Sequence, residues 1–296
     1  MNKRIIFEGC ATALITPFKG GALDLDAMGA LIDNQILAGV DALVIAGTTG
    51  EASCLTSSER ERLFYFSRER ASGRCKLILG VGSNDTATAI ANARLAEKVG
   101  CDGVLAVTPY YNKGTRLGLK SHYLAIAEST SLPILLYNVP SRTGVNIPIE
   151  TVRSLAEHPN VVGIKEASDS QDRLTELSSI SEDMPLYAGN DSQIYSTLAL
   201  GGLGAISVAS NAVPKLIMKL IRDFKTGKWR EALALQLKLL PFISSLFIET
   251  NPAPIKFLCA HLGLCEGDIR LPLSEVPSDV GKIILKEYER VSRIQA

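Results

Sequence analysis

Short apolar segments and longer segments of helical periodicity alternate along most of this chain. Each apolar segment is hydrophobic at successive positions, which is typical of a parallel strand buried on both faces. Helix-start signals follow several of them: Asp24 is a candidate N-cap for a helix over about 25–38, and Thr56 with Glu59 forms a capping box. The alternation predicts eight strand–helix units, with strands in CATALIT, ALVIA, LILGVG, GVLAVTP, PILLYNVP, VVGIKEAS, PLYAGN and GAISVAS.

Eight consecutive units favour a closed (β/α)8 barrel over an open doubly wound sheet. A dinucleotide-binding fold lacks its G-x-G-x-x-G signature after the first strand, and GVGSND after the third strand contains only part of it. Beyond about Gly227, three helical segments follow one another without strands. We therefore expect a barrel catalytic domain over residues 1–226 and a C-terminal three-helix appendage over residues 227–296.

The charge balance argues against a nucleic-acid partner, because 31 basic and 31 acidic residues are interspersed and the formal net charge is +0. No apolar run approaches the roughly 20 residues of a membrane-spanning helix. The N-terminal MNKRIIFEGC has no apolar signal-peptide core. We expect a soluble, cytoplasmic protein with neither a nucleic-acid nor a membrane partner.

The cysteines and histidines predict no metal site. The six cysteines show no C-x-x-C spacing, and Cys75 and Cys101 are interpreted as small residues in or near the core. The three histidines are far apart and form neither an H-x-x-H nor an H-E-x-x-H pattern.

Lys165 ends the apolar run VVGI, at the edge of a barrel where active sites form. Two interpretations are open: the strand surfaces and the lysine is solvated, or a partly dry pocket favours the neutral amine and makes it a nucleophile. Side chains alternate along a strand, so Gly163 shares the face of Lys165 while Glu166 points the other way. If Lys165 faces the barrel axis, we expect Gly163 to leave space beneath it, and Glu166 to lie on the helix side rather than to be its charge partner.

Two more segments end at the same edge. GTTGE follows the second strand, and its Thr48 and Thr49 hydroxyls beside free amides suit a carboxylate, although an ordinary turn is the alternative. Tyr137 ends the fifth strand and neighbours Lys165 in a barrel, where a phenol can relay protons; a core tyrosine is the alternative. The glycines of LGGLGAIS precede the eighth strand and are interpreted as turn residues.

Together, six segments resemble the dihydrodipicolinate synthase family, pyruvate-dependent class I aldolase-like enzymes that also include N-acetylneuraminate lyase. The resemblance covers essentially the whole chain and implies condensation of pyruvate with L-aspartate 4-semialdehyde, without a cofactor. The paired threonines and the arginine of SRTG favour this reaction over sugar-acid cleavage by a related aldolase, which remains the alternative. The segments are ITPF, GTTGE, TPYYNK, YNVPSRTG, GIKEAS and ETNPAPIK.

The resemblance implies a catalytic set and a substrate-binding set. In the first, Lys165 forms a Schiff base with pyruvate and Tyr137 transfers protons. Thr48 and Tyr111 complete a hydroxyl relay, with Tyr111 reaching across from a neighbouring subunit, so that a homotetramer or at least a homodimer is expected. The substrate-binding set is Thr49 for the pyruvate carboxylate, Ile206 for nearby backbone contacts and Arg142 for the carboxylate of the aldehyde.

The resemblance also implies a lysine-effector site at Ala52, Arg60, Asn84, Thr88 and Tyr110. Lysine-inhibited members carry a histidine and a glutamate where this chain has Arg60 and Thr88. A cationic Arg60 repels the ammonium groups of lysine, and Thr88 removes an acceptor. We therefore expect this site to be degenerate and lysine to inhibit weakly or not at all.

Two other classes of protein remain open from the sequence. A phosphate-binding barrel isomerase needs a glycine-rich anion loop after strand seven or eight, for which GND and SVASN are poor candidates. A barrel that binds an acid without catalysis needs no reactive lysine.

Overall fold

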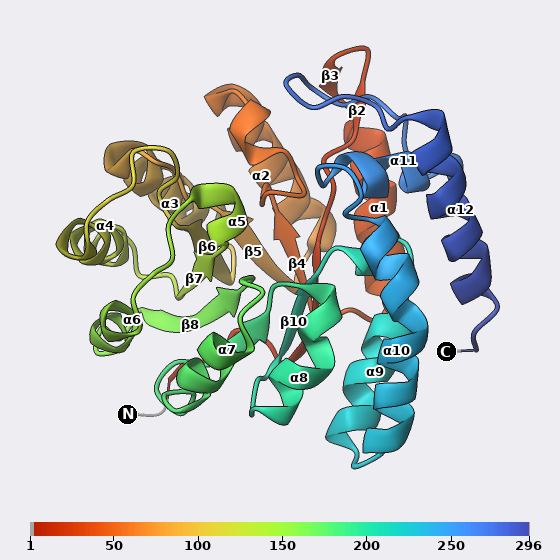
Figure 1. Cartoon of the computed structure of the whole chain (residues 1–296). Coiled ribbons are helices and arrows are strands. Elements are labelled where there is room, and N and C mark those ends of the chain that lie inside the picture. Colours follow the sequence, from red (N-terminus) through yellow and green to blue (C-terminus); the bar gives the residue numbers. More distant parts are fainter. Residues whose placement is uncertain (1–2, 296) are drawn as a thin grey trace.

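The computed structural model describes residues 3–295. Eight parallel strands form a closed barrel in the order β1-β10-β9-β8-β7-β6-β5-β4, which confirms the predicted fold class (Figure 1). They are β1 (Gly9–Ala13), β4 (Ala42–Ile45), β5 (Lys76–Gly80), β6 (Gly103–Val107), β7 (Ile134–Asn138), β8 (Val161–Glu166), β9 (Leu186–Ala188) and β10 (Gly204–Ser207).

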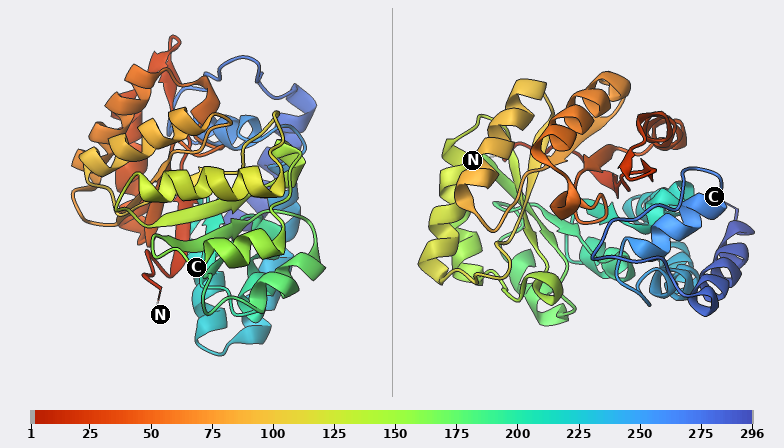
Figure 2. Two further views of the ribbon diagram at one scale, coloured as in Figure 1. Left: turned by 90° about the vertical axis from the view of Figure 1, so that its left-hand side faces the viewer. Right: turned by 90° about the horizontal axis from the view of Figure 1, so that it is seen from above.

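A ring of helices surrounds the barrel (Figure 2). The predicted caps are present: Asp24 accepts a hydrogen bond from the amide of Ala27, and Thr56 and Glu59 form the reciprocal capping box. The helices are α1 (Leu25–Ala38), α2 (Ser57–Ala71), α3 (Thr86–Val99), α4 (Arg116–Glu128), α6 (Ile149–Leu155), α7 (Gln171–Ser178), α8 (Ile194–Ala199) and α9 (Pro214–Lys225).

Several short elements are not predicted from the sequence. These are the hairpin of β2 (Phe18–Lys19) and β3 (Ala22–Leu23), the single turn α5 (Pro140–Thr143), and the 3₁₀ helices η1 (Ala52–Cys54), η2 (Asp191–Gln193) and η3 (Ala209–Asn211). Most of them follow a barrel strand, so they shape the face on which the predicted site residues lie.

Alternation along the strands divides the apolar side chains into two clusters. One lies between strands and helices, and the other fills the barrel with residues that include Leu135, Tyr137, Tyr187 and Ile206. Phe7 belongs to the inner cluster and stacks on Tyr187, with ring centroids 4.6 Å apart. The barrel interior is therefore packed. A polar group that faces inward near the carboxyl ends of the strands meets side chains rather than bulk water.

Three further helices confirm the C-terminal appendage: α10 (Trp229–Ser245), α11 (Ala253–His261) and α12 (Ser278–Ser292). α10 packs against α9 and α12, and α11 packs against α12 and η3. They lie along one side of the barrel, and α11 is near the end that carries the β2–β3 hairpin (Figure 1). No helix within residues 3–295 is both long and apolar enough to cross a membrane.

Candidate active site

Lys165 and Tyr137 are neighbours on adjacent strands, as predicted. They are paired in the register of β8 and β7, and Lys165 Nζ lies 4.2 Å from the centroid of the Tyr137 ring. Both side chains are buried, with exposed fractions of 4% and 6%. The interpretation of Lys165 as a solvated surface residue is therefore wrong.

Gly163 is closely packed, and the neighbours that exclude a side chain here are not Lys165 itself. A Cβ atom at this position would lie 2.8 Å from the carbonyl oxygen of Pro185 and 3.0 Å from Leu135 Cδ2. Any side chain here would press against backbone and against the barrel interior, below Lys165 on the same face of β8.

Glu166 faces away from the barrel interior, also as predicted. Its carboxylate accepts a hydrogen bond from Arg173 Nε at 2.8 Å and is further bonded by Asn138 Nδ2. The ion pair with Arg173, on α7, is almost fully buried. Adjacency in sequence thus does not make Glu166 the charge partner of Lys165.

The GTTGE turn after β4 packs closely against neighbouring backbone. Ala46, just before it, and Glu51, its last residue, have positive φ angles of 51° and 52°. A Cβ atom on Gly50 would meet the backbone of Ala46 at 3.1 Å. Thr49 is buried within this turn, and its Oγ1 accepts a hydrogen bond from Asn251 Nδ2 at 3.1 Å. The Thr49 oxygen accepts this hydrogen bond through a lone pair, and its O–H group can at the same time donate to a carboxylate.

Arg142 lies on α5, directly after β7. Proline at the first position starts this single turn, and Gly144, with a φ angle of 67°, ends it. Arg142 Nη2 donates to the carbonyl oxygen of Asn251 at 3.1 Å. Asn251 therefore touches both predicted carboxylate-binding residues.

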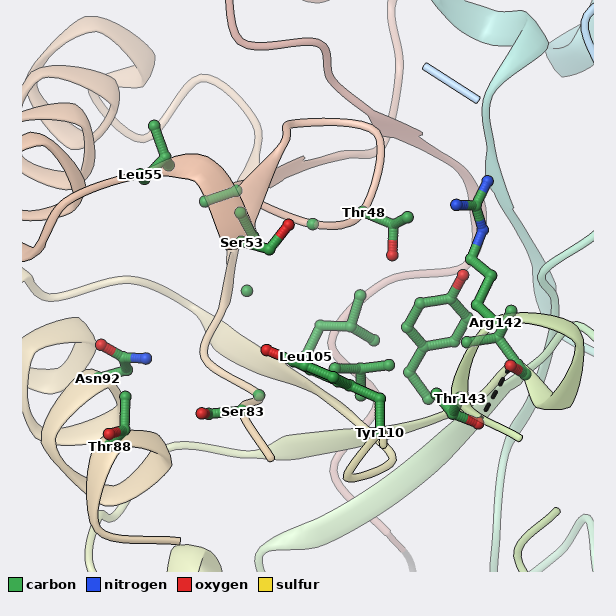
Figure 3. A pocket seen from close by; sticks show the side chains of 18 of the residues that line it. Thr48, Ser53, Leu55, Ser83, Thr88, Asn92, Leu105, Tyr110, Arg142 and Thr143 are labelled. Atoms are coloured by element: carbon green, nitrogen blue, oxygen red, sulfur yellow. Dashed lines mark hydrogen bonds between the residues drawn. The ribbon is translucent and has the colours of Figure 1, made fainter. Parts of the chain in front are cut away.

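A cavity of about 410 Å³ brings several predicted residues together. Figure 3 shows Thr48 and Arg142 at one end, and Thr88 and Asn92 at the other. Tyr137 forms part of its wall. The remaining lining residues are Ala46, Gly47, Ala52, Ser53, Leu55, Arg60, Gly80, Gly82, Ser83, Leu105, Val107, Tyr110, Val139 and Thr143.

Five predicted residues are not among those that line this cavity: Lys165, Thr49, Tyr111, Ile206 and Asn84. Tyr111 is 88% exposed and has a positive φ angle of 72°. Ile206, on β10, is fully buried in the inner cluster with Tyr137. Within one chain, the hydroxyl relay is therefore represented by Thr48 and Tyr137 only.

Most of the predicted effector residues line the cavity, and Figure 3 shows Thr88 at the end opposite Arg142. Arg60 is nine-tenths buried, and its guanidinium donates to the carbonyl oxygens of Gly80 and Ala52 at 3.1 and 2.7 Å. Thr88 and Tyr110 also line the cavity, whereas Asn84 does not.

Asp191, in the GND segment after β9, is not among the site residues predicted from the sequence. It is 2% exposed, and its Oδ2 accepts hydrogen bonds from the amides of Val208 and Ala209 at 2.9 Å. Burial raises the pKa of Asp191, against the opposing effect of these hydrogen bonds and of the positive charge of Lys165. The acidic residue after an apolar strand was the only sequence signal for it. Within the described part of the chain, no group of three or more His, Cys, Asp or Glu residues is placed to hold a metal ion.

A closed barrel with a buried lysine beside a tyrosine at the carboxyl ends of its strands is the arrangement expected of a (β/α)8 lyase of the class I aldolase type. The Dihydrodipicolinate synthetase family model matches residues 6–286. The chain belongs to this family.

Close relatives carry one name. The 4-hydroxy-tetrahydrodipicolinate synthase of Endomicrobium trichonymphae is 45% identical over 272 residues, covering 92% of this chain and 94% of that protein. The enzyme of the same name from Alkaliphilus oremlandii is 45% identical over 286 residues, covering 96% and 99%. The solved structure of the synthase from Methylacidiphilum fumariolicum SolV superimposes with a TM-score of 0.94 at 41% identity, covering 96% of each chain.

Proposed function

We propose that this chain acts as a 4-hydroxy-tetrahydrodipicolinate synthase, which condenses pyruvate with L-aspartate 4-semialdehyde in lysine and diaminopimelate biosynthesis in the cytoplasm. The observation that carries the proposal is the buried Lys165 amine beside Tyr137, next to a cavity lined by Thr48 and Arg142. The names of the relatives favour this reaction over sugar-acid cleavage.

In the first half-reaction, Lys165 Nζ attacks C2 of pyruvate and forms a carbinolamine. The Tyr137 hydroxyl, with Thr48, supplies the proton with which water leaves, and an iminium results. Loss of a proton from the methyl group then gives an enamine. Thr49 and the amides of its turn hold the pyruvate carboxylate throughout, because a carboxylate accepts several charge-assisted hydrogen bonds.

In the second half-reaction, the enamine carbon attacks the aldehyde carbon, and the aldehyde oxygen takes up a proton. Arg142 holds the carboxylate of the semialdehyde as a bidentate partner. The amino group of the semialdehyde then attacks C2 of the iminium, closes the ring and releases Lys165. These steps exchange only protons and water, so we propose no cofactor.

We further propose that the relay is completed by Tyr111 of a neighbouring subunit, in a homotetramer or at least a homodimer. This proposal is supported by the exposed Tyr111 side chain and by the incomplete relay within one chain. An aromatic residue held outward with positive φ suits insertion into a partner.

Turnover of the two candidate substrates tests the function. We expect the purified protein to consume pyruvate and L-aspartate 4-semialdehyde together, and to leave N-acetylneuraminate and 2-keto-3-deoxy sugar acids intact. Cleavage of a sugar acid without condensation of the semialdehyde would establish the aldolase alternative instead.

A further inference from the structure

The C-terminal segment contacts the GTTGE turn through a buried ion pair. Lys256 Nζ, on α11, lies 2.5 Å from Glu51 Oε1, although the two residues are 205 positions apart in the chain. Neither side chain is more than 1% exposed. A pair so deeply buried is expensive to desolvate and is a poor source of stability compared with apolar packing. Its geometry therefore suggests a role other than stability.

Glu51 is held at both carboxylate oxygens. Its Oε1 pairs with Lys256, and its Oε2 accepts a hydrogen bond from the amide of Arg270 at 3.1 Å. The partner Lys256 is itself held, because the Phe18 ring centroid lies 4.2 Å from its Nζ. The backbone of Glu51 is left-handed, with a φ angle of 52°. A non-glycine residue persists in this strained conformation only where its surroundings hold it.

The position of Glu51 is transmitted to the two threonines. The amide of Glu51 donates to the carbonyl oxygen of Thr48 at 3.1 Å, and the amide of Gly50 donates to that of Gly47 at 3.1 Å. The turn is therefore compact, and displacement of Glu51 displaces Thr48 and Thr49 with it.

We propose that Lys256 is a positioning residue for pyruvate: its ion pair with Glu51 fixes the turn that carries Thr48 and Thr49. The C-terminal helices thereby take part in substrate binding. This inference rests on the proposed function, because the turn it concerns is the proposed pyruvate site.

Two variants separate the positioning of the turn from the destabilisation that an unpaired buried charge causes. Lys256→Met leaves the Glu51 carboxylate buried without its partner and lowers the thermal midpoint. The double variant Glu51→Gln, Lys256→Met removes both charges at similar volume, and we expect it to recover most of that midpoint. The measurement is the pyruvate concentration that gives half of the maximal borohydride-trapped adduct. We expect this concentration to stay about fivefold higher in the double variant than in the unmodified chain. A fivefold change is equivalent to about 1 kcal/mol, the loss of one hydrogen bond between the turn and pyruvate.

The matched control is Arg173→Met, which breaks the other buried ion pair, Arg173 with Glu166, on the helix-facing side of β8. We expect it to lower the thermal midpoint without changing half-saturation by pyruvate. The proposal is overturned if the double variant binds pyruvate like the unmodified chain, or if Arg173→Met weakens pyruvate binding equally. An unmodified chain that forms no adduct overturns the proposed function itself, and this inference with it.

Discussion

Replacing Gly163 by alanine tests whether the close packing two residues before Lys165 is required. The added Cβ would lie 2.8 Å from the carbonyl oxygen of Pro185, which also accepts the 2.8 Å hydrogen bond from the amide of Ile164. Relief of this contact must separate β8 from β9, and a second contact, with Leu135 Cδ2 at 3.0 Å, must displace Leu135. Overpacking costs about 1–3 kcal/mol, and the weakened backbone hydrogen bond costs about 1 kcal/mol more. The variant should therefore lose about 2–4 kcal/mol in unfolding free energy.

The same displacement moves Lys165, two residues further along the same face. Misplacement by about 1 Å lowers rates by about 100-fold, so imine formation should slow by one to two orders of magnitude. Denaturant unfolding measures the first effect, and the rate of borohydride trapping measures the second. Gly118→Ala is the control, because its Cβ, at an exposed position of α4, meets only Thr115 Oγ1 at 3.4 Å and should not destabilise. Unchanged stability and trapping in the Gly163 variant would refute the reasoning.

Three further outcomes are expected. Lysine at submillimolar concentration should not half-inhibit turnover, because Arg60 places a cation in the wall of the cavity; half-inhibition at that concentration would refute this. The hydrogen bond from Arg270 holds the pKa of Glu59 at about 2 in the folded protein. Glu59 therefore contributes its full stabilisation at pH values above its ordinary pKa of about 4.3, and this stabilisation is lost as the pH falls through about 2. The stability advantage over Glu59→Gln should therefore shrink between about pH 6 and about pH 3 in urea unfolding, whereas a constant difference would contradict the ion-pair effect. Tyr111→Phe should slow turnover at least tenfold with unchanged assembly by light scattering, and full activity would exclude Tyr111 from the relay.

Periodicity made the barrel predictable. Apolar runs buried on both faces alternate with capped helices, and few folds other than a (β/α)8 barrel accommodate eight such units. The same alternation predicted that Lys165 and Glu166 face opposite sides of the strand, because a one-residue step along a strand reverses the side chain. The pairing of Tyr137 with Lys165 followed from adjacent strands in sequence becoming neighbours in the barrel.

Contacts between distant segments were not predictable in this way. Asn251 reaches Thr49 across 202 residues, and Lys256 reaches Glu51 across 205. Lys256 lies in the apolar stretch APIKFLCAH, where neither periodicity nor spacing identifies an acidic partner. Such contacts depend on how α11 packs against the barrel, which local sequence patterns do not encode.

The central claim is that Lys165 forms a covalent imine with pyruvate. Borohydride reduction in the presence of pyruvate, followed by peptide mapping, tests it directly. We expect a single reduced pyruvyl adduct on Lys165 and none in Lys165→Arg. An adduct on a different lysine, or condensation of the semialdehyde with no adduct at all, would contradict the account.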